Sequence, residues 1–383
     1  MRALFLTGGG TGPVNALAPF ASAFRSDGHQ VLVGCHEENV NQICDLGLPA
    51  AVTTSQGLFE VMFTDRNGNK LGRPQGPQAE LEFSSRAFGR MAAAAYPTAC
   101  QLAEAWRPDV VVGGTRNYVA ALVARRFDIP YVCHAWDGIE RIPSDLTYAA
   151  DEISDLLEEL DVNQIPQEAM FIQTTHPTVR PADAEPARYM RWAPGNGQTP
   201  AEPWMLGTED GRPRICLTSG SRAAQIPDLG EAFFDRLVGA PAFAEAELVI
   251  CAPNPLAEQL QEKYSGHQGG IRAGWFPLDV VLPSCDLVAH HAGGVTAATA
   301  KWAGLPQLVL ADMEASADPC RRVDDFGASI TTVLSESTPQ WVNDASERML
   351  ANRDTFAAKA RELADLGASL PRPTEVIDLI EKL

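Results

Sequence analysis

The sequence lacks the features of secreted, membrane-spanning and nucleic-acid-binding proteins. None of its eight cysteines forms a CxxC pair, which argues against a zinc site and a disulfide framework. No apolar run approaches the roughly 18 residues of a membrane span, and the first one, Arg2–Thr7, is too short for a signal peptide. The net charge of −19 repels nucleic acid. We therefore expect a cytoplasmic protein with free thiols, without metal, and with no nucleic-acid or membrane partner.

What is present is enough apolar sequence for two packed cores. The 383 residues are 45% hydrophobic, and this length predicts two domains of roughly 150–200 residues. A strand at Arg2–Thr7, a glycine-rich turn, a helix at Val14–Asp27 and a strand at Gln30–Cys35 open the chain, and the alternation restarts at Arg214–Thr218. Such alternation predicts the α/β class, with two parallel sheets that helices cover on both faces.

The division between the two halves is expected where periodicity is lost. Pro, Gly and polar residues cluster over Thr174–Pro213 without a sustained pattern. We place an N-terminal domain at 1–205, a C-terminal domain at 206–370 and a terminal helix at 371–383. A ligand crevice is expected between the domains, at the carboxyl ends of the strands.

The segment Trp275–Gln307 has the strongest chemical signal. A predicted strand ends in two histidines, two glycines follow, and a helix begins directly after them. Small residues and free N–H groups at a helix start suit an anion such as a diphosphate. A neighbouring His can donate to a phosphate oxygen, and a Trp face can hold a nucleobase. In order, the segment contains Trp275-Phe276-Pro277, Leu282-Pro283-Ser284-Cys285-Asp286, His290-His291-Ala292-Gly293-Gly294-Val295-Thr296 and Gly304-Leu305-Pro306-Gln307.

This ordered string resembles the nucleotide-binding signature of GT-B glycosyltransferases, in particular the actinobacterial enzymes that attach deoxysugars to antibiotic aglycones. Their pattern is Trp-x-Pro, Leu-Pro-x-Cys-Asp, His-His-Gly-Gly-x-Gly-Thr and Ala-Gly-x-Pro-Gln. The resemblance extends to Arg321-Arg322-Val323, to Ser219-Gly220-Ser221-Arg222 and, in the first half, to Gly28-His29-Gln30-Val31. It implies a GT-B fold, in which two Rossmann-like domains face each other across a cleft.

The resemblance also implies the roles of the two halves. In such enzymes the second half holds the dTDP or UDP part of the sugar donor, and the first half holds the acceptor. No metal or cofactor is implied, because a helix end and hydrogen bonds can offset the charge of the leaving diphosphate. The implied donor-binding residues are Ser219, Ser221, Arg222, Trp275, Phe276, His290, His291, Gly293, Gly294, Val295, Thr296 and Glu314. The acceptor-binding candidates are Gly10, Pro13, Asn15, Phe59, Phe63, Phe83 and Trp136.

Two departures from the family pattern affect the donor site. Ala292 and Val295 stand where the family usually has Gly, and β-branched residues resist positive φ. We therefore expect Gly294 to take any left-handed position in the turn. In the family an Asp-Gln pair binds sugar hydroxyls at this point, and Ala315-Ser316 stands there in this chain. The adjacent Glu314 could substitute for the pair, as could Asp318. A deoxysugar donor, which has fewer hydroxyls, is consistent with this loss.

A third departure affects the general base. Sugar transfer with inversion needs an acceptor that is deprotonated as it attacks the anomeric carbon. Many relatives carry a basic His in the first loop, but Pro13 occupies that position here and Asn15 is not a base. Asp137, which follows a predicted strand and should face the crevice, is the best candidate. His134 is the second choice.

The acceptor and the bond that forms stay open at this stage. Some C-glycosyltransferases for aromatic polyketides resemble this arrangement, with no first-loop His and an Asp after the same strand. A phenolic acceptor suits it, because its oxygen or ortho carbon becomes a nucleophile on losing an acidic proton. The sequence is therefore compatible with both O- and C-linkage. It is also compatible with a homodimer.

Two rival functions remain. Gly8-Gly9-Gly10-Thr11-Gly12 follows a strand, as in an NAD(P)-dependent oxidoreductase, but Pro13 stands where that fingerprint needs its third Gly. The oxidoreductase hypothesis also leaves Trp275–Gln307 unexplained. The second rival is a non-catalytic nucleotide-sugar binder or auxiliary protein, which the missing first-loop His and Val295 favour.

Overall fold

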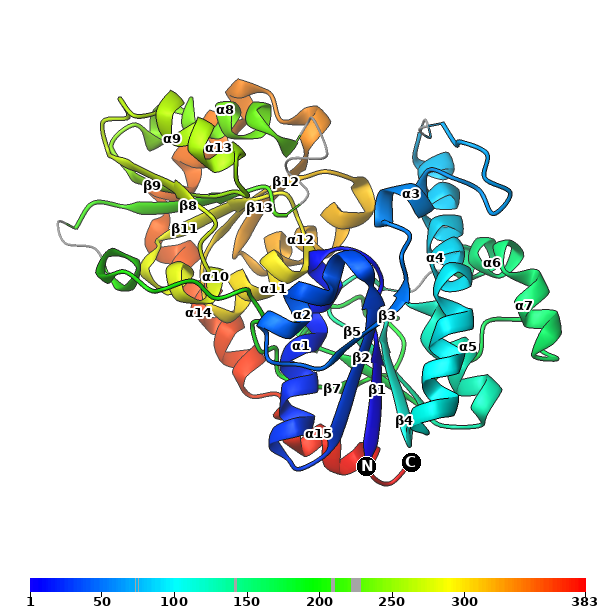
Figure 1. The fold of residues 1–383 in the computed structure, drawn as a ribbon. Helices are drawn as coiled ribbons and strands as arrows, with labels where there is room; N and C mark the ends of the chain where they lie inside the picture. Colours follow the sequence, from blue (N-terminus) through cyan, green and yellow to red (C-terminus); the bar gives the residue numbers. More distant parts are fainter. Residues whose placement is uncertain (73, 75, 141–142, 208–210, 222–228) are drawn as a thin grey trace.

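The computed structural model describes residues 1–383 except 73, 75, 141–142, 208–210 and 222–228. Two sheets dominate it, a seven-stranded sheet in the order β3-β2-β1-β4-β5-β6-β7 and a six-stranded sheet in the order β10-β9-β8-β11-β12-β13. Neighbouring strands are parallel throughout both sheets. Helices cover both faces of each sheet (Figure 1). The α/β class and the pair of Rossmann-like domains that the sequence predicts are thus confirmed.

The first sheet and its helices come from the first half of the chain. Its strands are β1 (Arg2–Leu6), β2 (Gln30–His36), β3 (Ala50–Thr54), β4 (Val110–Gly114), β5 (Tyr131–Ala135), β6 (Met170–Gln173) and β7 (Arg188–Tyr189). Its helices are α1 (Thr11–Ser26), α2 (Val40–Asp45), α3 (Leu58–Met62), α4 (Pro77–Trp106), α5 (Tyr118–Phe127), α6 (Pro143–Glu152) and α7 (Ser154–Glu159). Central strands read as continuous apolar runs because both faces are buried, as the consecutive valines of β4 show.

The second sheet begins at Arg214. Its strands are β8 (Arg214–Thr218), β9 (Glu247–Cys251), β10 (Ile271–Gly274), β11 (Leu287–His290), β12 (Gln307–Ala311) and β13 (Ser329–Val333). The helices that follow are α8 (Glu231–Val238), α9 (Leu256–Lys263), α10 (Leu278–Val281), α11 (Gly294–Trp302), α12 (Glu314–Phe326), α13 (Pro339–Ala351), α14 (Arg353–Ala368) and α15 (Pro373–Ile380). Short 3-10 helices lie at η1 (Glu37–Asn39), η2 (Pro177–Val179), η3 (Pro203–Leu206), η5 (Pro241–Phe243), η6 (Leu282–Ser284) and η7 (Leu334–Glu336).

The two domains touch through their helices and through the end of the chain. α1 lies beside α11, and Ala16 and Trp192 of the first half pack with Ala298 of α11. α15 returns to the first domain and lies beside α1, where Val376 and Ile377 join its core (Figure 1). The last helix therefore ties the second half of the chain to the first.

Several helices and strands that the sequence predicts agree with the structure, but the sequence analysis misses one long helix. Tyr118–Phe127, Arg214–Thr218 and Leu287–His290 match from end to end. α1 begins at Thr11 rather than at Val14, because Pro is tolerated in the first turn of a helix. The 30-residue helix α4 was not predicted.

Candidate active site

The donor loop is assembled from the ends of two neighbouring strands. β8 pairs with β11 so that Thr218 lies opposite His290, and the residues that follow each strand therefore meet. A Cβ on Gly220 would lie 2.5 Å from Cε1 of His291, and one on Gly293 would lie 2.6 Å from its Nε2. The imidazole of His291 thus occupies the space between the two loops, and both glycines are required for its placement.

His290 shapes this loop from inside the domain. Its side chain is fully buried, its Nδ1 accepts from the Ala292 N–H at 3.1 Å, and its Nε2 lies 2.9 Å from Oε1 of Gln307. Because Nδ1 accepts, Nε2 carries the proton and donates it to Gln307. Burial lowers the pKa of His290 to about 3, so the ring stays neutral. Both ring nitrogens of His290 are thus engaged by the protein, and its predicted contact with the diphosphate stays a prediction.

The left-handed residue of the turn is Ala292, not Gly294 as expected. Ala292 has φ +67°, and the Gly293 that follows has φ −59°. Ala can adopt this region at a modest cost, whereas a β-branched residue cannot. Gly294 is instead the first residue of α11, and its lack of a side chain leaves room for Asp137 and Trp136.

The loop presents groups that suit an anion. α11 begins at Gly294, with Val295 half-buried and Thr296 buried in its first turn, and its leading N–H groups lack partners within the helix. The Oγ of Ser219 is buried and has no hydrogen-bond partner in the described part of the chain. A buried hydroxyl without a partner is costly, so a ligand oxygen at this position would stabilise it. Ser221 lies half-buried two residues further on.

The two aromatic candidates have different environments. Trp275 is exposed, with 39% of its surface accessible to solvent. Phe276 instead packs edge-on against Trp204, with ring centroids 5.0 Å apart, and lies over Gly274. Phe276 is therefore half-buried against the core of the second domain, and its predicted place near the nucleobase stays a prediction.

Glu314, the candidate sugar reader, is the first residue of α12. Its carboxylate pairs with Arg321, an ion pair that lowers the pKa of Glu314, and the side chain is 58% exposed. Its partner is thus an arginine of its own helix. Arg222, the remaining donor candidate, lies outside the described residues.

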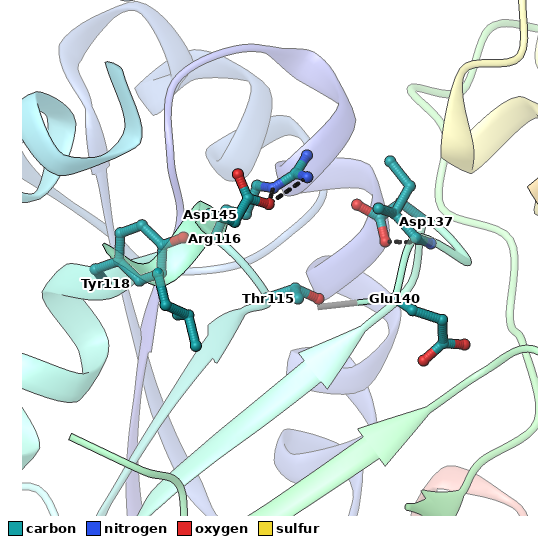
Figure 2. A pocket seen from close by; sticks show the side chains of 8 residues that line it. Thr115, Arg116, Tyr118, Asp137, Glu140 and Asp145 are labelled. Atoms are coloured by element: carbon teal, nitrogen blue, oxygen red, sulfur yellow. Dashed lines mark hydrogen bonds and ion pairs between the residues drawn. The ribbon is translucent and has the colours of Figure 1, made fainter. Parts of the chain in front are cut away.

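Asp137 lies just beyond β5 and lines a narrow pocket with Arg116 and Asp145 (Figure 2). The cavity has a volume of about 10 Å³, which is room for about one water molecule. The Asp137 carboxylate accepts from the Ile139 N–H at 3.1 Å. Burial raises the pKa of Asp137, and the positive charge of Arg116 opposes that rise. Such an environment is typical of a carboxylate that exchanges a proton in its working range.

Arg116 and Asp145 were missed from the sequence. Arg116 donates to Oδ2 of Asp145 at 2.6 and 2.9 Å, and Asp145 also accepts from Ser85. Arg116 follows β4 by two residues, just as Asp137 follows β5, and these strands are neighbours. Their shared place at the carboxyl edge of the sheet was the signal available in the sequence.

The loop that carries Asp137 contacts the donor domain directly. A Cβ on Gly294 would lie 2.7 Å from both Cα and Cβ of Asp137 and 3.0 Å from Cζ3 of Trp136. Trp136 also lies near Gly12 at the start of α1. Trp136 thus packs between the two domains, and the absent side chain of Gly294 is what allows Asp137 to approach the N-terminus of α11.

His134, the second candidate base, is inside the core. Its ring is 1% exposed and stacks on Phe20 with centroids 5.6 Å apart. Neither ring nitrogen has a hydrogen-bond partner in the described residues, and burial lowers the pKa of His134 to about 4. His134 thus lies in the core of the first domain, and its role as the second candidate base stays a prediction.

The acceptor candidates divide into a cluster and scattered residues. Phe59 stacks on Phe63 at 6.5 Å, and Phe63 lies 5.1 Å from Phe83 across α3 and α4. All three rings are half-buried and form one aromatic surface. Asn15 is buried in α1 and accepts from Gln42 at 2.8 Å, and its role with the acceptor stays a prediction.

The first-loop positions surround the start of α1. Gly10 precedes that helix with φ +91°, and its N–H donates to Asn39 at 3.2 Å. Pro13 is half-buried in the first helical turn. Among the described residues, no cluster of three or more His, Cys, Asp or Glu side chains is arranged to hold a metal ion, and no helix combines the length and apolarity needed to cross a membrane.

The fold and this site together define a two-domain glycosyltransferase of GT-B architecture. The chain belongs to the family of erythromycin biosynthesis protein CIII-like proteins, whose N-terminal domain matches residues 22–220 and whose C-terminal domain matches residues 236–383. It is a glycosyltransferase of the antibiotic deoxysugar type. The expected family and the expected transferase class are thereby confirmed, and the oxidoreductase hypothesis is excluded.

Individual relatives cover nearly the whole chain. The sequence is 26% identical to the L-demethylnoviosyl transferase of Streptomyces niveus, over 99% of this chain and 97% of that protein. It is 28% identical to the elloramycin glycosyltransferase ElmGT of Streptomyces olivaceus, over 98% and 96%. Among solved structures, the glycosyltransferase SsfS6 of Streptomyces sp. SF2575 in complex with thymidine diphosphate has a TM-score of 0.86 and 28% identity, with both chains covered fully.

Proposed function

We propose that this enzyme transfers a deoxysugar from a dTDP- or UDP-sugar to an aromatic, polyketide-like acceptor with inversion, and that Asp137 is the general base. The observation that carries the proposal is the contact between Asp137 and Gly294. A carboxylate residue of one domain lies against the N-terminus of the helix that would bind the diphosphate. The proton acceptor and the leaving group are then held on either side of one reaction centre.

The donor side follows from the loop around His291. The N-terminus of α11 and the Ser219 hydroxyl would accept the diphosphate, and the exposed face of Trp275 would stack on the base. Thymidine diphosphate in the similar SsfS6 structure supports dTDP as the first donor to test. The helix end would offset the charge of the leaving diphosphate, so no metal or cofactor is required.

The acceptor side follows from the aromatic surface of Phe59, Phe63 and Phe83. Flat rings favour a flat aromatic acceptor. A phenol loses its proton more readily than an alcohol, which suits a carboxylate base. Attack by the phenolate oxygen gives an O-glycoside, and attack by its ortho carbon gives a C-glycoside.

The test is mass-spectrometric turnover of dTDP-deoxysugars with a panel of phenolic polyketide acceptors. Asp137→Asn keeps the size of the side chain and removes the base, so we expect turnover to fall by about 10²–10⁴-fold. The matched control is Asp161→Asn, because Asp161 carries an exposed carboxylate just after α7. Near-normal turnover in Asp137→Asn would refute the base assignment, and acid-labile products would identify O-linkage.

A further inference from the structure

Arg322 of α12 reaches out of the donor domain to the main chain of the acceptor domain. Its Nη2 donates to the carbonyl oxygen of Gly138 at 2.9 Å, and its Nε donates to that of Val179 at 3.1 Å. Its Nη1 pairs with Asp318, one turn earlier on the same helix, at 2.6 Å. The side chain is only 15% exposed. One guanidinium thus bridges two segments of the opposite domain while its own helix holds it in place.

The Gly138 carbonyl is adjacent to the proposed base. Gly138 follows Asp137 directly and has φ +72°, a conformation that glycine adopts freely and that needs other contacts to hold it. Pro319 of α12 closes the other side, since a Cβ on Gly138 would lie 3.4 Å from Cβ of Pro319. Arg322 and Pro319 therefore restrain the residue after Asp137, while Gly294 restrains Asp137 itself.

We propose that Arg322 of the donor domain is a positioning residue that places the Asp137 carboxylate of the acceptor domain. The proposal rests on the proposed function, in which Asp137 is the base. The guanidinium fork has fixed geometry and bridges two carbonyls at once, which a flexible ammonium cannot reproduce. The donor domain thereby supplies both the proposed diphosphate site and the restraint on the proposed base.

The test compares Arg322→Met and Arg322→Lys with wild type and with Arg353→Met. Arg353 is a matched control, since it is an exposed arginine of the same domain whose ion pair with Asp286 stays within that domain. The probes are turnover of the best donor–acceptor pair from the panel, the affinity for dTDP by calorimetry, and hydrogen–deuterium exchange of peptides that cover Trp136–Glu140.

We expect kcat of Arg322→Met to fall by about 10–100-fold, since a misplacement of about 1 Å can cost that much. The affinity for dTDP and the melting temperature should stay close to wild type, and exchange over Trp136–Glu140 should accelerate. The kcat of Arg322→Lys should lie between those of wild type and Arg322→Met, because Lys keeps the positive charge and a single donor nitrogen. Arg353→Met should resemble wild type in every measurement.

A double-mutant cycle separates the two proposals. If Arg322 acts through Asp137, Arg322→Met should cause no further loss in an Asp137→Asn background. A full second loss would overturn the positioning role, as would equal losses of kcat and of dTDP affinity in Arg322→Met. Unchanged exchange over Trp136–Glu140 would overturn the positioning role alone, whereas an active Asp137→Asn enzyme would refute the base assignment and, with it, the role of Arg322 in placing that base.

Discussion

Gly294 and Asp137 approach each other so closely that a side chain on Gly294 would overlap the backbone of Asp137, at 2.7 Å from its Cα. The two residues belong to opposite domains, and both come from the carboxyl edges of their sheets. Their contact defines where the proposed base meets the proposed diphosphate site. Because of this contact, even the addition of one methyl group at Gly294 tests the placement of Asp137.

Gly294→Ala should therefore lower turnover by about 10²-fold, because the added methyl group pushes the Asp137 loop away from α11. Gly367→Ala in α14 is the control, since a Cβ there meets nothing within 4 Å. Steady-state turnover and melting temperature together separate loss of placement from loss of folding. A Gly294→Ala enzyme with wild-type turnover would show that the contact does not matter for catalysis.

The left-handed conformation of Ala292 predicts opposite effects for two substitutions. Ala292→Gly removes a cost of about 1–2 kcal/mol in the folded state and adds about 0.4–1 kcal/mol of unfolded-state entropy. The free energy of unfolding should rise slightly. Ala292→Val places a β-branched residue at φ +67° in a buried site, so it should be clearly less stable than wild type. Chemical denaturation of wild type, Ala292→Gly and Ala292→Val measures both changes in the free energy of unfolding. An Ala292→Val variant as stable as wild type would contradict this account of the turn.

The buried imidazole of His134 should make the fold acid-sensitive. Its pKa is about 4 in the folded protein and about 6.5 in an unfolded chain. Between these values the unfolded chain binds the proton more tightly. The free energy of unfolding should therefore fall as the pH decreases through this window, by up to about 1.4 kcal/mol per pH unit.

His134→Phe keeps a ring against Phe20 and removes that proton site. The variant should lose less stability than wild type when acidified and should keep its turnover, because the ring is buried in the core. Melting temperatures at neutral and acid pH provide the comparison. Loss of turnover with an unchanged melting temperature would support His134 as a catalytic candidate.

Arg116→Gln should shift the acid limb of the kcat/KM profile to higher pH. Asp137 works as a base only when it is deprotonated, burial raises its pKa, and Arg116 opposes that effect. Without the guanidinium the pKa of Asp137 rises further, so activity is lost first at acid pH. Arg116→Lys keeps the charge and should shift the limb less. An unchanged limb in Arg116→Gln would mean that Asp137 does not set it.

Arg116→Gln also removes the ion-pair partner of the buried Asp145 carboxylate. Asp145 is 3% exposed and loses both hydrogen bonds from Arg116. Stability should fall by about 3 kcal/mol, which a melting curve reads independently of the pH profile.

The sequence by itself was sufficient for the α/β class, the two halves and the donor segment. Alternating apolar runs are a local property, and so is the order of His, Gly and Thr in Trp275–Gln307. The absence of a basic residue at Pro13 could also be read directly, and it turned attention to Asp137. Each of these inferences needs only neighbouring residues and the chemistry of their side chains.

Only the tertiary structure decided which of those side chains face the cleft. His290 and His291 are adjacent, yet the pairing of β11 with β8 on one side and with β12 on the other buries His290 against Gln307 and places His291 beside Gly220. The burial of His134, the place of Arg116 beside Asp137 and the reach of Arg322 across the domains depend in the same way on strand order and domain packing. These contacts join residues far apart in the chain, and no local pattern encodes them.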